Sequence, residues 1–318
     1  MILIYPLNLI APITDQEYQS ILASAGDKEV RLTRDLDEAI ELSRTAKVIF
    51  GDIRQEFIEV GTNLDWVQSV GAGVNMIAEY VGNKPITIVS ARGLVGSHLA
   101  EHAFALLLAV TRGVGEAIRN PGWEHREQIR LKQWEFTDRT ITIVGMGSAG
   151  QAVAKRARGF EFKKIIGVDL SRNVDQQYLD LLIDNNQLED YLSESDVICL
   201  TLPLTHGNKG WFDYRLMANF KPGSVLINVS RGGLVVQTDL LKLLEQGHIW
   251  AAGLDVLETE PLETDNALFR NHQLVISPHI AGGSPLRASR LVEQFCENLQ
   301  RWNSGDELIG RYDSNLGF

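Results

Sequence analysis

The chain has few of the features that mark secreted, membrane-spanning or metal-caged proteins. It contains only two cysteines among 318 residues, Cys199 in an apolar run and Cys296 in a helical pattern. We therefore expect neither a disulfide framework nor a cysteine metal site. No apolar run is long enough to span a membrane, and the apolar start lacks the basic region and cleavage site of a signal peptide. The cytoplasm is the expected location.

The sequence also lacks blocks of basic residues. Its 41 Asp and Glu residues exceed its 30 Lys and Arg residues, and the formal net charge is −11. This balance disfavours contact with a phosphate backbone, so we expect no nucleic-acid partner. Hydrophobic residues make up 44% of the chain and charged residues 22%, which is ordinary for a globular protein. A length of 318 residues favours two domains.

What the sequence does contain is a repeated strand–helix rhythm, which predicts an α/β fold with parallel sheets. A long apolar helix over 97–114, with Ser97 as its N-cap, separates two such series. A connector rich in tryptophan and charge follows this helix, and the tail over 285–302 is helical again. The apolar runs predicted to be strands are 2–7, 47–52, 64–73, 86–93, 140–145, 163–169, 196–203, 224–230, 251–256 and 274–279.

A glycine-rich turn, GMGSAG, lies between a predicted strand and a predicted helix. In the pattern G-x-G-x-x-G, Gly145 permits the turn, Gly147 lets a pyrophosphate approach, and Gly150 lets the helix pack on the strand. Asp169 ends the next strand about 20 residues later, where a carboxylate binds ribose hydroxyls and repels a 2′-phosphate. The turn therefore favours NAD over NADP, although Arg172 could supply a phosphate contact. An ordinary strand–helix turn is the alternative.

Three residues have the chemistry that carbonyl reduction needs: Arg231 and His279 lie at the ends of predicted strands, and Glu260 lies in the loop after the strand 251–256. His279, in SPHIAGG, is a natural proton donor to a carbonyl oxygen near neutral pH. Glu260, in LETEPL, would stabilise the imidazolium and raise its pKa. Arg231, in NVSRGGLV, can bind a carboxylate through two hydrogen bonds. A strand-end histidine, a solvated acidic loop and a loop salt bridge are the respective alternatives.

These motifs, in this order, resemble the D-isomer-specific 2-hydroxyacid dehydrogenases over essentially the whole chain. The segment GLVGSHLAEHAFALLL and the C-terminal tail are similar to the glyoxylate/hydroxypyruvate reductase A branch of that family. The resemblance implies an NAD(P)H-dependent 2-oxoacid reductase that forms a D-(R)-2-hydroxyacid, with a cleft between two Rossmann-like lobes and a homodimeric assembly. It also implies that the dinucleotide-binding lobe, 98–283, is inserted into the substrate-binding lobe, 1–97 with 284–318.

The resemblance also assigns roles to single residues, none of them to a metal. His279 would be the general acid/base, Glu260 its partner, and Arg231 the ligand of the substrate carboxylate. Ala72 and Gly73, in SVGAGVN, would offer backbone amides to the same carboxylate. Asp255 would orient the nicotinamide through its carboxamide. The cofactor-binding residues implied are Gly145, Met146, Gly147, Ser148, Ala149, Gly150, Asp169, Leu202, Pro203, Val229, Ser230, Asp255 and Gly282.

Some positions depart from the family pattern. Arg92 stands where a proline is more frequent, either as a second anion contact or as a solvent-facing loop residue. The glycine turn lacks the arginine–isoleucine pair that often precedes the last glycine, so cofactor affinity would rest more on backbone amides. His98 and His102 share a helical face at the i, i+4 spacing of a metal pair. Without a third ligand, they are interpreted as packing or polar contacts.

Two other functions stay open at this point. One is a non-catalytic NAD-sensing protein, similar to the corepressors that share this fold. The other is a different dehydrogenation, such as phosphite oxidation. Formate oxidation is disfavoured, because formate enzymes of this superfamily usually have an amide where Glu260 stands.

Overall fold

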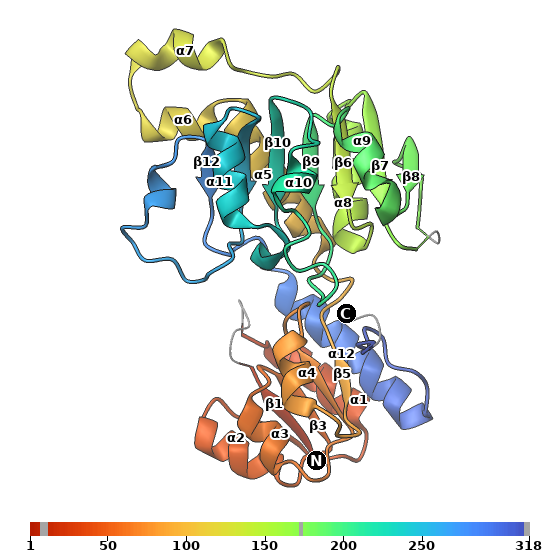
Figure 1. Ribbon diagram of the computed structural model, residues 1–318. Helices are drawn as coiled ribbons and strands as arrows, with labels where there is room; N and C mark the ends of the chain where they lie inside the picture. Colours follow the sequence, from red (N-terminus) through yellow and green to blue (C-terminus); the bar gives the residue numbers. More distant parts are fainter. Residues whose placement is uncertain (7–11, 172–173, 315–318) are drawn as a thin grey trace. The chain divides into compact units, whose positions relative to one another are not determined.

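The structure is a computed structural model that describes residues 1–6, 12–171 and 174–314. It divides into two compact units (Figure 1): unit 1 is Met1–Val95 with Gly283–Phe318, and unit 2 is Gly96–Gly282. Each contains one sheet, and every pairing between named strands is parallel. The predicted α/β class with two parallel sheets is therefore confirmed. The first boundary between the units lies after Val95, where the sequence predicted it after residue 97. The second lies after Gly282, where the sequence predicted it after residue 283.

Unit 1 is built on a five-stranded sheet with the order β2-β1-β3-β4-β5. Its strands are β1 (Ile2–Tyr5), β2 (Val30–Leu32), β3 (Val48–Gly51), β4 (Trp66–Ser69) and β5 (Thr87–Val89). Its helices are α1 (Asp15–Ala25), α2 (Leu36–Ser43), α3 (Gln55–Val60), α4 (Asn75–Val81) and α12 (Arg287–Ser304). The central strands are buried on both faces, which is why they appear in the sequence as continuous apolar runs.

Apolar layers cover both faces of this sheet. On one face Ile4 and Phe50 pack with α1 and α12, and Phe295 of α12 stacks on Phe50 with 4.3 Å between ring centroids. On the other face Leu3 and Ile49 pack with residues of α2, α3 and α4. The helix α12 therefore shares a core with the first strand of the chain, although unit 2 lies between them in sequence.

Unit 2 is built on a seven-stranded sheet with the order β12-β11-β10-β9-β6-β7-β8. Its strands are β6 (Thr140–Val144), β7 (Lys164–Val168), β8 (Leu181–Ile183), β9 (Val197–Leu200), β10 (Ser224–Asn228), β11 (Ile249–Leu254) and β12 (Leu274–Ile276). Its α-helices are α5 (Gly96–Thr111), α6 (Val114–Arg119), α7 (Arg126–Arg130), α8 (Ser148–Gly159), α9 (Leu188–Leu192), α10 (Tyr214–Met217) and α11 (Gln237–Glu245). Among the described residues, no helix is long and apolar enough to cross a bilayer.

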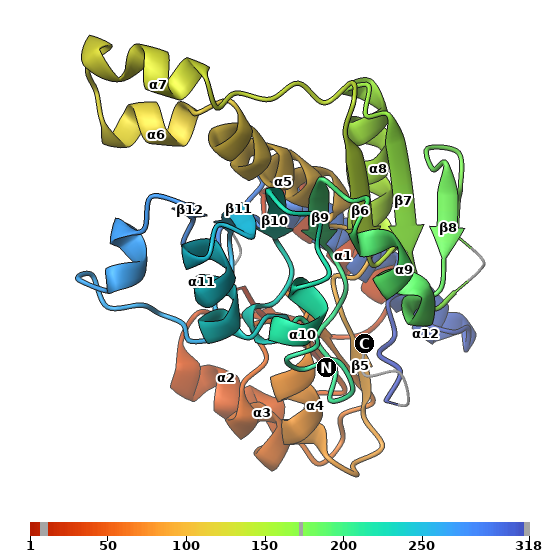
Figure 2. The same ribbon diagram turned by 45° about the horizontal axis from the view of Figure 1, so that its top comes forward.

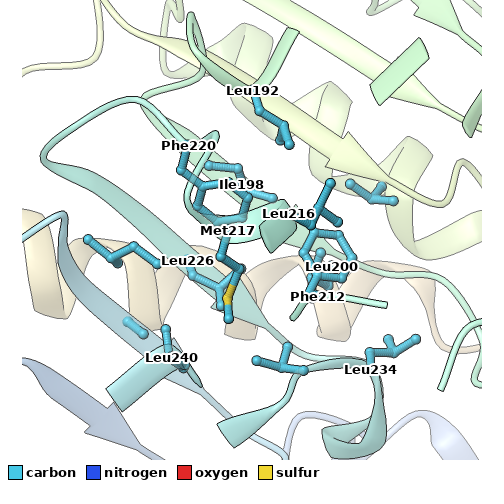
Figure 3. Packing of buried hydrophobic residues seen from close by; sticks show 14 of the residues in the cluster. Leu192, Ile198, Leu200, Phe212, Leu216, Met217, Phe220, Leu226, Leu234 and Leu240 are labelled. Carbon is cyan, nitrogen blue, oxygen red and sulfur yellow. The ribbon is translucent and has the colours of Figure 1, made fainter. Parts of the chain in front are cut away.

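Alternate residues of the strands in unit 2 face two separate apolar layers. Val197 and Cys199 of β9 belong to the layer formed with α5 and α8. Ile198 and Leu200 belong to the opposite layer, which is formed with α9, α10 and α11. Figure 3 shows the side chains of this layer pointing toward one another. Burial raises the pKa of the Cys199 thiol to about 12, so this cysteine acts as a small apolar residue, as predicted.

The strand order of unit 2 determines where a ligand can bind. The chain runs outward from β6 through β7 to β8, and then returns to the other side of β6 to form β9. The loops after β6 and β9 therefore leave the sheet in opposite directions, and the space between them is the usual binding position in open parallel sheets. The predicted glycine turn follows β6 and the predicted Leu202–Pro203 loop follows β9.

The structure differs from the sequence-based prediction in three local features. The strands β2 and β8 were not predicted, because each has only three residues and is incompletely buried. The helix predicted over 97–114 ends at Thr111, since Gly113 adopts a left-handed conformation (φ 68°) before α6 begins. Ser97 is not the N-cap, because α5 already begins at Gly96. The Ser97 hydroxyl instead donates to Glu101 and accepts from Arg156.

Candidate active site

The glycine turn joins β6 to α8 in a conformation that only small residues allow. Gly145 has a φ of 96°, in the region that favours glycine. A Cβ atom on Gly150 would lie 2.0 Å from the carbonyl oxygen of Gly145, so the helix could not approach the strand. A Cβ atom on Gly147 would meet nothing within 4 Å. The backbone thus leaves open space before the N-terminus of α8, which fits a pyrophosphate.

Asp169 lies beside this turn, directly after β7. Its Oδ2 accepts a hydrogen bond from the amide of Met146 at 2.7 Å, and its Oδ1 accepts one from the amide of Ser171 at 2.8 Å. The carboxylate is therefore held next to the glycine turn, where the sequence predicted a ribose ligand. Arg172, considered as a phosphate contact, lies outside the described residues.

The loops after β9 and β10 are tied to the same edge of the sheet. The Thr201 hydroxyl donates to the carbonyl of Gly145 at 2.6 Å, and the Ser230 hydroxyl donates to the carbonyl of Leu202. Leu202 and Val229 are buried, whereas Pro203 is exposed. The residues predicted after three neighbouring strands, β6, β9 and β10, therefore meet at one edge.

His279 and Glu260 form a direct pair. The Nδ1 atom of His279 lies 2.7 Å from Oε2 of Glu260, and the amide of Leu257 donates to Oε1 of Glu260 at 2.7 Å. Because both carboxylate oxygens are engaged, the position of Glu260 is fixed, and Nδ1 is the imidazole nitrogen that it holds. The His279 side chain is 51% exposed, which leaves the imidazole accessible to a small molecule.

Arg231 follows β10 and lies close enough to Glu260 to interact electrostatically. Its Nη1 donates to the carbonyl of Ser230 at 2.7 Å, and its own carbonyl accepts from the Asn228 side chain at 3.0 Å. Burial lowers the pKa of the Arg231 guanidinium, and the Glu260 carboxylate opposes part of that shift. A largely desolvated cation beside one carboxylate is a suitable place for a second anion.

Gly232 explains how the segments that carry Arg231 and Glu260 approach each other. A Cβ atom on Gly232 would lie 1.9 Å from the carbonyl oxygen of Leu257. Any larger residue would therefore push the Arg231 turn away from the loop that ends in Glu260. The glycine after Arg231 in the motif is thus required by close packing between two loops.

Asp255 is buried directly after β11 and is bound by groups of the chain itself. Its Oδ1 accepts from the Ser277 hydroxyl at 2.6 Å and from the amide of Ile280 at 2.9 Å, and its Oδ2 accepts from the amide of Ala281 at 2.9 Å. The Nε2 atom of His102 also lies 3.2 Å from Oδ1 of Asp255. Gly282, predicted as a cofactor contact, directly follows this segment.

The sequence predicted packing or polar contacts for the two histidines that share a face of α5. His98 is buried, and His102 makes polar contacts with Ser277 and Asp255. Within residues 1–6, 12–171 and 174–314, no three His, Cys, Asp or Glu side chains are grouped so as to hold a metal ion. The sequence did not predict which groups His102 contacts, because Ser277 and Asp255 are distant from it in the chain.

In unit 1, Ala72 and Gly73 lie exposed in the loop between β4 and α4. Three contacts hold the residues just before them: the Ser69 hydroxyl accepts from the amide of Gly71, the amide of Ala91 donates to the carbonyl of Gly71, and Arg287 donates to the carbonyl of Val70 at 2.7 Å. No sequence motif marked Arg287, since it lies at the far end of the chain. Arg92 is exposed in the loop after β5.

The chain matches known proteins over most of its length. Residues 104–281 match the family described as D-isomer specific 2-hydroxyacid dehydrogenase, NAD binding domain. A glyoxylate reductase from Korarchaeum cryptofilum is 34% identical over 259 residues, 80% of this chain and 77% of that protein. A hydroxypyruvate reductase from Thermotoga maritima is 32% identical over 267 residues, 80% of this chain and 83% of that protein.

A solved structure extends this similarity to the whole fold. It is an NADPH-dependent glyoxylate/hydroxypyruvate reductase from Sinorhizobium meliloti in complex with NADP and sulfate. It matches with a TM-score of 0.82 and 25% identity, and the match covers 100% of this chain and 99% of that chain. The predicted resemblance is thereby confirmed. The chain belongs to the D-isomer specific 2-hydroxyacid dehydrogenase family, an oxidoreductase family, and its cofactor is NAD or NADP.

Proposed function

We propose that the protein reduces a 2-oxoacid to a D-(R)-2-hydroxyacid with NAD(P)H, and that glyoxylate and hydroxypyruvate are the substrates to test first. The observation that carries this proposal is the pairing of His279 Nδ1 with Glu260 Oε2 at 2.7 Å, with Arg231 close by. The same residue types are needed to protonate a carbonyl oxygen and to bind a neighbouring carboxylate.

The chain's own groups divide the chemistry between them. Because Glu260 holds Nδ1, the other imidazole nitrogen of His279, Nε2, is free to donate a proton to the C2 oxygen. The guanidinium of Arg231 binds the substrate carboxylate with two hydrogen bonds and draws electron density from the carbonyl. When bound, the nicotinamide supplies the hydride, and the protein supplies orientation and the proton.

We assign the dinucleotide to unit 2 and the recognition of the substrate carboxylate in part to unit 1. The open space at Gly147 and the residues after β6, β9 and β10 support the first assignment. The exposed position of Ala72 and Gly73 supports the second, since the residues before them are held by Ser69, Ala91 and Arg287. Backbone amides are effective ligands of carboxylates because their direction is fixed.

We propose NAD as the preferred cofactor. The Asp169 carboxylate beside the glycine turn supports this choice, because it can accept from ribose hydroxyls and would repel a 2′-phosphate. The reductase of Sinorhizobium meliloti is NADPH-dependent, so both cofactors need to be tested.

The decisive experiment is a panel of 2-oxoacids, from glyoxylate to phenylpyruvate, with NADH and NADPH in parallel. The expected result is steady cofactor oxidation with at least one 2-oxoacid, faster with NADH. Chiral analysis of the product should give the (R)-isomer. Binding of NADH without turnover on any member of the panel would reject the proposed reaction and favour a sensing role.

We infer that the protein is a cytoplasmic homodimer. The two cysteines are unpaired, as expected in a reducing compartment. In Figures 1 and 2, α6 and α7 lie side by side at the margin of unit 2. Four large apolar side chains of this segment are exposed, and exposed apolar groups concentrated in one region mark interaction surfaces. They are Val114 (49%), Ile118 (74%), Trp123 (88%) and Leu131 (87%).

A second copy of the chain is the occupant that we propose for this surface. Within the segment Glu127 pairs with Arg126 at 2.8 Å and with Arg130 at 3.2 Å. A copy related by a twofold axis presents the same mixed charges, so opposite charges can also pair across the axis. Light scattering should give twice the chain mass of 35.4 kDa. The double variant Trp123→Glu, Leu131→Glu should be a monomer. A monomeric wild-type protein would exclude the dimer.

A further inference from the structure

We propose that His102 is a positioning residue: from helix α5 it holds, through Ser277 and Asp255, the backbone segment that carries His279. His102 lies far from His279 in sequence and does not belong to any of the motifs that indicate catalysis. Its contacts, however, lead by hydrogen bonds to the loop 277–281.

Asp255 binds this loop through both its backbone and its side chain. The backbone carbonyl of Asp255 accepts from the amide of His279 at 2.9 Å. Its carboxylate accepts from the amides of Ile280 and Ala281, each at 2.9 Å. Three consecutive amides are therefore bound by one residue, whose side chain is only 2% exposed. Few movements of the loop are possible without breaking one of these bonds.

The hydrogen bonds to Asp255 maintain an unusual backbone conformation at His279. His279 has a φ of 53°, a left-handed conformation that residues other than glycine seldom adopt. Such a conformation persists only where neighbouring contacts impose it. Without the contacts to Asp255, the loop would relax toward ordinary backbone angles, and the imidazole would leave its position against Glu260.

Ser277 connects Asp255 to α5. The Ser277 hydroxyl has a single proton, which it donates to Oδ1 of Asp255 at 2.6 Å. The Nε2 atom of His102 lies 2.7 Å from the Ser277 oxygen and must therefore be the donor of that bond. The same Nε2 lies 3.2 Å from Oδ1 of Asp255. His102 thus fixes the direction of the Ser277 hydroxyl and supports the buried carboxylate.

Helix α5 is a rigid base for this chain of bonds. It packs on β10, β11 and β12, the strands that precede Arg231, Asp255 and His279 respectively. Its residues Phe104, Leu106 and Leu107 are buried in the apolar layer of unit 2. A donor on this helix can therefore hold the loop in the same place in every molecule, as preorganised sites require.

The first experiment measures the loop directly, in the protein without cofactor. Hydrogen–deuterium exchange of peptides that span 277–281 is compared for the wild type, His102→Phe and His102→Gln. Phenylalanine fills the space without a donor, whereas the glutamine amide nitrogen occupies the position of Nε2. We expect about tenfold faster exchange in His102→Phe, and exchange near the wild-type rate in His102→Gln.

A matched control lies next to His102 on the same helix. Glu101 is exposed and pairs with Arg156 at 2.8 Å, away from the loop 277–281. The variant Glu101→Gln should leave exchange of the loop unchanged. If His102→Phe does not fold, Ser277→Ala replaces it, and it should show the same acceleration to a smaller extent. Unchanged exchange in the folded donor-free variant, or faster exchange in His102→Gln as well, would overturn the role of His102.

The second experiment measures catalysis, and here the inference rests on the proposed function of His279. We expect kcat to fall about tenfold in His102→Phe and to recover in His102→Gln, while KM for the 2-oxoacid changes less than about twofold. The primary isotope effect on kcat with deuterated NADH should increase, because the chemical step becomes slower. A smaller folded fraction would lower kcat without changing that isotope effect.

The two experiments separate the failure of this inference from failure of the proposed function. If the wild type oxidises no NADH with any 2-oxoacid, the proposed function fails, while the exchange experiment still tests the hold on the loop. If the wild type is active and His102→Phe keeps full kcat despite faster exchange, the contribution of His102 to catalysis is excluded.

Discussion

The loops at the carboxyl ends of the strands differ between the two units, although both sheets are parallel. In unit 2 the loops after β10, β11 and β12 carry the ionisable side chains of Arg231, Asp255 and His279. In unit 1 the loop after β4 exposes the backbone of Ala72 and Gly73. Under the proposed function, unit 2 supplies proton transfer and charge, whereas unit 1 supplies directional binding. Substitutions in unit 2 should therefore lower kcat, whereas substitutions in unit 1 should mainly raise KM.

The largest expected effect follows from the proton donor in unit 2. His279→Ala removes the imidazole that is paired with Glu260, and kcat should fall by about 10²–10⁴-fold, the usual contribution of general acid catalysis. Steady-state kinetics with the best 2-oxoacid measure this, and NADH binding followed by fluorescence should remain within about twofold. Near-normal turnover would mean that another group donates the proton.

A smaller effect in the same unit is expected at Arg231. Arg231→Lys keeps one positive charge but loses the planar pair of donors, so kcat/KM should fall by about 10²-fold through both constants. A change in KM alone would indicate that Arg231 binds the substrate without favouring the transition state. In that case the contrast between the two units would be weaker than proposed.

In unit 1 the corresponding test removes a backbone amide. Ala72→Pro deletes one N–H, and a hydrogen bond to a charged carboxylate is worth about 1.5–3 kcal/mol, so KM should rise about tenfold or more. The change in kcat should stay within about threefold if chemistry belongs to unit 2. Ala72→Gly, which keeps the amide, is the matched control. Equal losses in kcat for both units would contradict the division of roles.

The smallest catalytic effect is expected for Asp196, which lies at the amino end of a strand in unit 2, whereas the predicted site residues follow the carboxyl ends. Asp196 precedes β9, and its carboxylate accepts from Lys221 at 2.8 Å, from the amide of Thr140 at 2.9 Å and from Arg139 at 2.9 Å. Burial raises the pKa of Asp196, but these hydrogen bonds outweigh burial and lower it overall. Asp196→Asn should therefore leave kcat unchanged and reduce stability by about 1–3 kcal/mol at neutral pH.

The pH dependence of this loss has a definite sign. A carboxyl group whose pKa is lower in the folded state stabilises the fold above its unfolded pKa of about 3.9. That contribution disappears as the pH falls through the folded value. Denaturant unfolding should therefore show a constant difference between wild type and Asp196→Asn from pH 7 to 5, and a shrinking difference below about pH 4. A difference that is undiminished at pH 3 would assign the effect to packing.

Much of the fold could be predicted because parallel strands buried on both faces produce continuous apolar runs, as in β3 and β10. The short edge strands β2 and β8 have no such run, so they escaped prediction. The end of α5 was also missed, because the left-handed turn at Gly113 interrupts an apolar pattern that continues into α6. These errors concern elements whose sequence is not constrained by burial on both sides.

The sequence by itself determined the glycine turn, Asp169 after the next strand, and the three residues Arg231, Glu260 and His279. Each of them lies in a short motif whose residues are neighbours in the chain. Only the tertiary structure decided how they are held: His279 against Glu260, Gly232 against Leu257, and Asp255 against the loop 277–281. The physical reason is that these contacts join separate strands of one sheet. Their partners are set by strand order and close packing, which no local pattern encodes.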